Sequence, residues 1–155
     1  MELKTKVTAS ETTQDLMVIR DFDLPVTMLF KAFTDAELFA QWMGTRVLVF
    51  DMQTLGSYRF ETVNAEGQIV FRAHGCIHEL ESAKRIVRTF EMEQINFPAQ
   101  LEFLDFESLG KDKSRLCMLI IFRSADHRND LLKLPFAYGL NMAHDRLQNL
   151  FSTKK

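Results

Sequence analysis

The chain has 155 residues, of which 46% are hydrophobic and 26% charged, and its 19 basic and 21 acidic residues give a formal net charge of -2. This length fits one domain with its own core, and this composition is typical neither of a disordered chain nor of a membrane protein. The balanced charge also argues against nucleic-acid binding, because such proteins usually carry a basic patch. We therefore expect a single domain over residues 1–155, with no nucleic-acid partner and no membrane insertion.

The N-terminal part of the chain favours a cytoplasmic location. Residues 1–22 contain no apolar stretch of signal-peptide length. Farther along, the apolar run from Leu116 to Phe122 is far too short to span a bilayer. The two cysteines are distant in sequence and form no C-x-x-C pair, so we expect no disulfide framework.

The first elements are a strand and two short helices. Leu16–Phe22 has the composition of a strand, and Pro25 is typical of a first helical turn, where its missing N–H is harmless. Apolar residues then recur three and four positions apart from Val26 to Phe33, which predicts a helix. Thr34 and Glu37 have the spacing of a capping box, so a second helix is expected to begin there and to end at Gly44.

After Gly44 the hydrophobic period changes from that of a helix to that of a strand. Alternating or β-rich segments predict strands at 46–51, 56–63, 68–79, 84–92, 98–107 and 114–123. Asn64–Gly67 predicts a hairpin turn, and Gly75 inside a strand predicts a bulge. With the first strand, this makes six or seven strands joined by short turns, which indicates an antiparallel meander.

The last part of the chain predicts one long helix. Leu140, Ala143, Leu147 and Phe151 recur at helical spacing, whereas residues 130–138 are expected to be bent or in a loop. An antiparallel sheet with one solvated face needs a cover for the other, and this helix can supply it. The predicted fold is α+β, and a curved sheet closing on a helix tends to leave a gap that can bind a small apolar molecule.

Two motifs resemble those of a known family. The segment Phe30–Gly44, FKAFTDAELFAQWMG, resembles the apolar-x-Ala-Leu-Thr-Asp-Pro-Glu run of the homologues of the C-terminal domain of the heat-shock protein 90 ATPase activator. Gly56–Phe60, GSYRF, resembles their Gly-Gly-x-aromatic-x-Phe strand start. The likeness extends over residues 17–151. It implies the helix-grip fold of the START-like (SRPBCC) superfamily, which the birch-pollen allergens share. In this fold a curved antiparallel sheet is wrapped around a long C-terminal helix.

The resemblance implies a fold more closely than a function. Superfamily members include lipid and hormone binders, polyketide cyclases, oxygenase domains and chaperone cofactors, so fold does not settle function. Chaperone activation is therefore not carried over, although a chaperone partner or a homodimer stays open. The sequence departs from the family pattern at Ala36, at Met43 and at Arg88, which stands where the family often has an aromatic residue.

The sequence contains no recognisable catalytic or metal-binding motif. His74 and His78 lie on one strand about 13 Å apart by strand rise, too far for one metal ion. No nucleophile, phosphate-loop or zinc signature is present, and Glu102 alternates with apolar neighbours as on a solvated face. We expect no catalytic residue, no metal and no cofactor.

The candidate ligand-contacting residues are mostly aromatic. Fourteen phenylalanines and eight methionines suit both a core and the wall of an apolar cavity. Arg88, between apolar neighbours, either extends to solvent or reaches a carboxylate on the protein or on a ligand. Trp42 is interpreted first as packing and second as part of the cavity mouth. The predicted cavity residues are Trp42, Tyr58, Phe60, Arg72, His74, Arg88, Phe90, Phe103, Met118, Phe136 and Met142.

Three functions are compatible with these residues and the predicted fold. The leading one is a domain that binds an apolar or amphipathic small molecule between the sheet and the last helix, without catalysis of its own. The second is an enzyme of the cyclase or dehydratase kind that uses the same cavity. The third is a protein-interaction module. Two convergent polar groups in the cavity would favour the enzyme, and an exposed apolar patch over a collapsed core would favour the interaction module.

Overall fold

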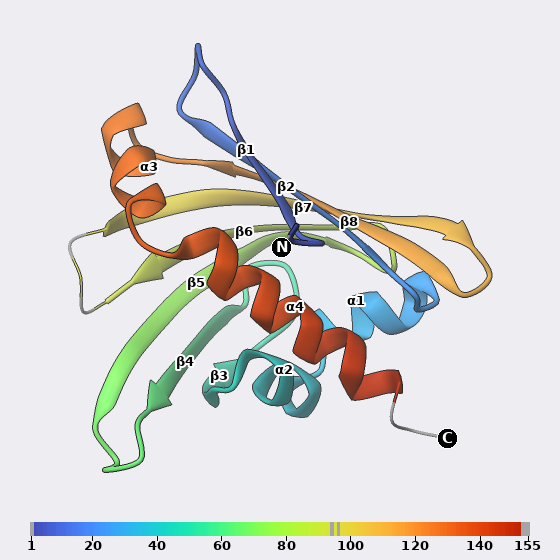
Figure 1. The fold of residues 1–155 in the computed structure, drawn as a ribbon. Coiled ribbons are helices and arrows are strands. Elements are labelled where there is room, and N and C mark those ends of the chain that lie inside the picture. Colours follow the sequence, from blue (N-terminus) through green and yellow to red (C-terminus); the bar gives the residue numbers. More distant parts are fainter. Residues whose placement is uncertain (1, 94, 96, 153–155) are drawn as a thin grey trace.

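The computed structural model describes residues 2–93, 95 and 97–152, and in these residues it has eight strands and four helices (Figure 1). In chain order they are β1 (Lys6–Ala9), β2 (Asp15–Phe22), α1 (Val26–Thr34), α2 (Ala36–Met43), β3 (Arg46–Phe50), β4 (Ser57–Val63), β5 (Ile69–Glu81), β6 (Arg85–Met92), β7 (Phe97–Gly110), β8 (Lys113–Ile121), α3 (Ala125–Leu132) and α4 (Phe136–Ser152). The order of elements confirms the predicted α+β class.

All the described strands belong to one antiparallel sheet. Their order across the sheet is β1-β2-β8-β7-β6-β5-β4-β3, so the chain runs as a meander from β3 to β8 and then pairs β8 with β2. The described strands number eight, one more than the upper sequence-based estimate, because residues 6–9 pair with β2 as an edge strand. The sheet is curved, as predicted (Figure 1).

Helix α4 crosses the concave face of this sheet, which is the helix-grip arrangement (Figure 1). Side-chain alternation explains why it docks there: in β8, Leu116, Met118 and Ile120 are buried, whereas the residues between them are partly exposed. Leu147 of α4 is fully buried against the same core. The core therefore lies between one face of the sheet and the helices.

The junction of the two short helices differs from the sequence-based prediction. The residue that caps α2 is Asp35, whose carboxylate accepts a 3.0 Å hydrogen bond from the Leu38 N–H. Thr34 is instead the last residue of α1 and donates its hydroxyl to the Phe30 carbonyl. The capping-box prediction was therefore wrong by one residue, since aspartate caps as well as threonine. The predicted end of α2 at Gly44 is confirmed, with φ at +65°.

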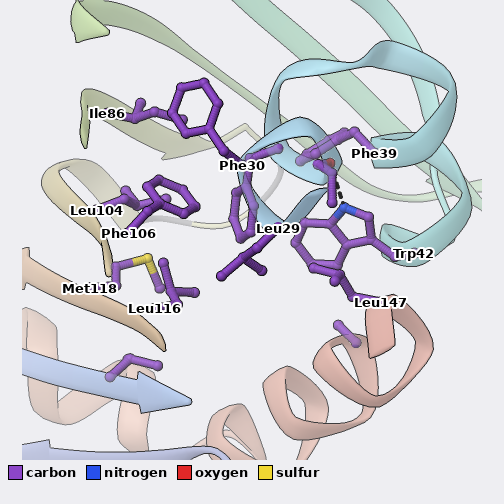
Figure 2. Packing of buried hydrophobic residues seen from close by; sticks show 14 of the residues in the cluster. Leu29, Phe30, Phe39, Trp42, Ile86, Leu104, Phe106, Leu116, Met118 and Leu147 are labelled. Atoms are coloured by element: carbon purple, nitrogen blue, oxygen red, sulfur yellow. Dashed lines mark hydrogen bonds between the residues drawn. The ribbon is translucent and has the colours of Figure 1, made fainter. Parts of the chain in front are cut away.

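Trp42 fastens the two short helices to each other and to α4. Its indole Nε1–H donates a 2.8 Å hydrogen bond to the carbonyl of Ala32, seen as the dashed line in Figure 2. The ring packs against Phe33 and Phe39, with centroids 4.9 and 5.5 Å away. Arg146 of α4 donates from Nε to the Trp42 carbonyl at 2.8 Å. The interpretation of Trp42 as packing therefore agrees with its contacts.

The C-terminal third contains one more helix than the sequence indicated. Residues 125–132 form α3, which Ser124 caps by accepting a hydrogen bond from the His127 N–H. The segment predicted to be bent or a loop is thus helical up to Leu132, and α4 begins at Phe136 directly after Pro135. No helix in the described part of the chain is long and apolar enough to cross a membrane.

Gly75 does not mark a bulge; it makes room for a neighbouring ring. It pairs in regular register with Tyr58, and the nearby register shift lies between Ile77 and Glu79. A Cβ added at Gly75 would lie 2.6 Å from the Tyr58 hydroxyl oxygen and closer still to the Thr89 carbonyl oxygen. The absence of a side chain lets Tyr58 donate a 2.6 Å hydrogen bond to that carbonyl.

We predict that Gly75→Ala destabilises the fold by about 2–3 kcal/mol, because the backbone or Tyr58 must shift to admit the methyl group. Gly139→Ala is the matched control, since an added Cβ there meets nothing within 4 Å. Because Gly139 lies in α4, its replacement should leave stability unchanged or raise it by up to about 1 kcal/mol. Urea unfolding of both variants measures the difference, and equal stabilities would contradict this account of Gly75.

Candidate functional site: a cavity between the sheet and the last helix

A cavity of about 220 Å³ lies between the concave face of the sheet and α4. Its wall is built by α1, α2, strands β4 to β8, α3 and α4, so nearly every element of the fold contributes. Six phenylalanines and three methionines are among the lining residues. They account for part of the phenylalanine and methionine excess that the composition showed.

Seven of the eleven residues predicted from the sequence border this cavity. They are Trp42, Tyr58, Phe60, Arg88, Phe90, Met118 and Phe136. They come from five different elements, which the fold brings together around one space. Whether they contact a ligand stays a prediction. The other four, Arg72, His74, Phe103 and Met142, lie outside the lining.

Arg72 and His74 lie on the opposite face of the sheet. Without a bulge at Gly75, strand alternation turns Ala73 inward and these two residues outward. Arg72 forms an ion pair of 2.7 Å with Glu61, and His74 Nδ1 lies 2.9 Å from the Glu93 carboxylate. These two residues therefore do not border the cavity, because the positions of β5 that face inward are Phe71, Ala73 and Ile77.

Phe103 and Met142 also face away from the cavity. In β7, Glu102 and Leu104 are buried, so Phe103 between them points to the outer face, where it pairs across the sheet with Val87 and Leu119. Met142 is 42% exposed because α4 turns other residues toward the sheet. We had expected Glu102 to face solvent and Phe103 to face the cavity. The structure shows the reverse for both residues.

An ion pair at the edge of the cavity joins Arg88 on β6 to Glu102 on β7. The two residues are direct cross-strand partners, and Arg88 Nε donates to Glu102 Oε1 at 2.8 Å. Their side chains are 13% and 5% exposed, so both charges are largely removed from water. Gln100 supplies a third member, donating from Nε2 to Glu102 Oε2 at 2.7 Å. The carboxylate that Arg88 reaches is therefore the protein's own.

Arg88 borders the cavity, and the outer part of its guanidinium has unused hydrogen-bond donors. Among the described residues, no hydrogen bond is formed to either of its Nη groups. Every fully buried side-chain nitrogen or oxygen in the described part of the chain does have a partner, so these two groups keep accessible surface. One face of the guanidinium is covered by Tyr58, whose ring centroid lies 5.5 Å from Cζ.

Tyr58 supplies a wall rather than a reactive hydroxyl. Its hydrogen is committed to the Thr89 carbonyl. Burial raises the pKa of the phenol well above its ordinary value. Tyr58 therefore stays protonated and contributes an apolar ring surface beneath Arg88.

A second polar group, His144 of α4, borders the cavity from the helix side. It is 1% exposed and lies between the rings of Phe22 and Trp42, at 5.7 and 6.2 Å. Nδ1 lies 2.8 Å from the Thr5 hydroxyl, which in turn accepts a hydrogen bond from Arg20. This network joins α4 to β2 and to Thr5, the residue directly before β1.

The imidazole of His144 is neutral at pH 7. Burial, followed by the nearby Arg20 guanidinium, lowers its pKa from 6.5 to about 3. Among the described residues no partner contacts Nε2 by a hydrogen bond, so this nitrogen also keeps accessible surface. The aromatic wall of the cavity thus carries a linked Arg88–Glu102–Gln100 group on the sheet and a neutral imidazole on the helix.

Sequence reasoning missed three of the polar residues: Gln100, Glu102 and His144. A signal for His144 was present, since it lies four residues after Leu140 on the helix and next to the core position Ala143. In the described residues, no group of three or more histidine, cysteine, aspartate or glutamate side chains is placed to hold a metal ion.

The comparisons with known proteins agree with this geometry. Residues 23–152 match the family described as "Activator of Hsp90 ATPase homolog 1-like protein". This match covers well over half of the chain, so the chain belongs to that family, and the resemblance seen in its motifs is confirmed. A search of curated proteins gave no significant match.

Solved structures of the same fold come from several bacteria. Protein Ms6760 of Mycobacterium smegmatis is 15% identical with a TM-score of 0.85, covering 97% of this chain and 98% of that one. A Rhodobacter sphaeroides protein is 18% identical with the same TM-score, covering 96% and 98%. DynU16, described as a protein in the dynemicin biosynthetic locus, is 18% identical with a TM-score of 0.69, covering 92% of this chain and 48% of that one. At these identities the likeness shows the fold alone.

The depressed pKa of His144 predicts a loss of stability in mild acid. The unfolded chain takes up a proton at His144 near pH 6.5, whereas the folded protein does so only near pH 3, so stability falls as the pH decreases between these values. From pH 7 to pH 5 we expect this residue to account for a loss of about 2 kcal/mol. Urea unfolding of the native protein and of His144→Gln at both pH values measures it, and parallel losses would contradict the assignment.

Proposed function

We propose that this protein is a binding module for a compact, largely apolar small molecule, which it holds in the cavity between the sheet and α4. The single observation that carries the proposal is the cavity itself, which is lined mainly by buried and half-buried aromatic and methionine side chains. Pockets that bind small molecules are typically concave and mostly apolar, with a few placed polar groups. The family and fold are compatible with this function.

The size of the cavity supports a small ligand. At about 220 Å³ it is below the range of roughly 300–1,000 Å³ typical of drug-sized ligands, and somewhat larger than a cavity of about 150 Å³ that holds benzene. A substituted single ring or a small bicyclic compound fits this volume better than a fatty acid or a steroid. Phe71, Phe90, Phe136 and Leu140 are only half-buried and would form the entrance.

A second candidate is an enzyme of the cyclase or dehydratase kind that uses the same cavity. The observation that favours it is the presence of Arg88 and a neutral His144 on one apolar cavity, because a neutral imidazole can accept a proton and a guanidinium can stabilise an oxyanion. Turnover of a bound ring compound that His144→Gln abolishes, while binding persists, would favour this candidate over simple binding.

The binding proposal predicts a ligand-dependent signal from Trp42. It is the chain's single tryptophan and borders the cavity, so isopropylbenzene entering the cavity should change its fluorescence. Filling the space with Leu131→Phe/Leu140→Phe should weaken binding of this probe at least about tenfold, since overpacking leaves no room for the ring.

The matched control also introduces two phenylalanines, but at solvent-exposed positions nearby. Leu134 and Met142 are 47% and 42% exposed and do not border the cavity. Leu134→Phe/Met142→Phe should therefore bind isopropylbenzene as the native protein does, judged by fluorescence and by calorimetric titration. Equal binding by both double variants, or no binding by the native protein of any small ring compound, would overturn the proposed function.

A further inference from the structure

We infer that the cavity selects neutral ring compounds that carry a hydrogen-bond acceptor, such as a ketone or amide carbonyl, and discriminates against both carboxylates and amines. The inference rests on the proposed binding function and names the chemistry of the ligand. It is carried by the way in which the polar groups of the cavity are already paired with one another.

The charges that line the cavity cancel. Among the described lining residues, Arg88 and Glu102 are those that carry a formal charge, and they neutralise each other at 2.8 Å. Of the other titratable lining groups, His144 is neutral and Tyr58 stays protonated. A ligand carboxylate would therefore bring an unbalanced negative charge into a space with little water, and the same holds for an ammonium group with the opposite sign. Burying an unpaired charge is strongly unfavourable.

The donors of Arg88 are only partly used. Its Nε donates to Glu102, but its Nη groups donate to no described residue and keep accessible surface beside the cavity. A ligand oxygen that accepts from these groups would make a charge-assisted hydrogen bond without changing the net charge. A hydrocarbon in the same position would leave the donors without an acceptor.

Glu102 offers no comparable site for a ligand donor. One of its oxygens accepts from Arg88 and the other from Gln100, at 2.8 and 2.7 Å. The carboxylate thus already has a hydrogen-bond donor on each oxygen and an adjacent positive charge. A ligand amine would compete with Arg88 for the Glu102 carboxylate. The group formed by Arg88, Glu102 and Gln100 therefore offers a ligand hydrogen-bond donors rather than acceptors.

The imidazole of His144, on the helix side of the cavity, also offers a hydrogen-bond donor. Arg20 can only donate, so the hydroxyl oxygen of Thr5 accepts from it and its hydrogen is free for His144 Nδ1. This arrangement satisfies the buried hydroxyl and leaves the proton of the neutral ring on Nε2. Nε2–H is then a second donor, on a residue that borders the cavity. Both polar walls therefore favour a ligand that accepts hydrogen bonds.

Four probes of similar size test this inference in the native protein: acetophenone, isopropylbenzene, benzoate and benzamidine. They place a ketone, a hydrocarbon, an anion or a cation on the same ring. We expect calorimetric titration at pH 7 to show binding of acetophenone and isopropylbenzene, with benzoate and benzamidine at least roughly 100-fold weaker than acetophenone.

A paired substitution separates the hydrogen bond from the fit of the ring. Arg88→Met/Glu102→Leu removes both charges together, because removing one alone would leave the other buried without a partner. Acetophenone should lose about tenfold in affinity relative to isopropylbenzene, as expected for loss of a hydrogen bond to a charged donor. Arg85→Met/Asp105→Leu, an exposed ion pair on the same two strands, is the control and should leave the ratio unchanged.

The outcomes separate this inference from the function on which it rests. If isopropylbenzene binds but benzoate binds as tightly as acetophenone in the native protein, the inference is overturned and the binding function stands. An unchanged ratio of acetophenone to isopropylbenzene affinity in Arg88→Met/Glu102→Leu overturns it as well. If none of the four probes binds, the proposed function fails, and the inference with it. The comparison of probes in the native protein decides the matter even if the variant does not fold.

Discussion

The buried ion pair between Arg88 and Glu102 is the constraint on which the chemistry of this cavity depends. The two residues are cross-strand neighbours on a face that α4 and the aromatic side chains remove from water. In such surroundings an unpaired charge would strongly destabilise the fold, so each residue requires the other. Gln100 completes the arrangement by donating to the remaining carboxylate oxygen. The result is a cavity with no net charge, in which the polar groups that are still free to bind a ligand are hydrogen-bond donors.

The shape of the cavity follows from how the helices meet the curved sheet. Trp42 joins α1 and α2 through its hydrogen bond to Ala32 (Figure 2). Its carbonyl accepts one from Arg146, so α1, α2 and α4 are fixed to one another. Gly75 lets the Tyr58 ring lie flat enough to reach the Thr89 carbonyl. Aromatic rings held in this way pack edge to face, and the cavity lies beside them.

Local signals predicted the fold well, because period, turn chemistry and the Phe30–Gly44 motif are properties of short segments. They could not decide which face of a strand is buried. In β7, Glu102 and Phe103 lie on opposite faces of the sheet, as the alternation of a strand requires. Phe103 is nevertheless on the outer face and Glu102 on the inner one, since Glu102 has an ion-pair partner on the neighbouring strand. That partner is 14 residues away, so the pairing depends on the register of the sheet rather than on any local pattern.

The central claim, that a small molecule occupies the space between the sheet and α4, can be tested directly with methionine methyl groups. Met43, Met92 and Met118 border the cavity, whereas Met28 and Met142 are exposed elsewhere. In a ¹³C-methyl NMR titration with acetophenone, the account predicts shifts of the first three signals that saturate together, with the other two unchanged. Shifts confined to the exposed methionines, or no shift at saturating acetophenone, would contradict it.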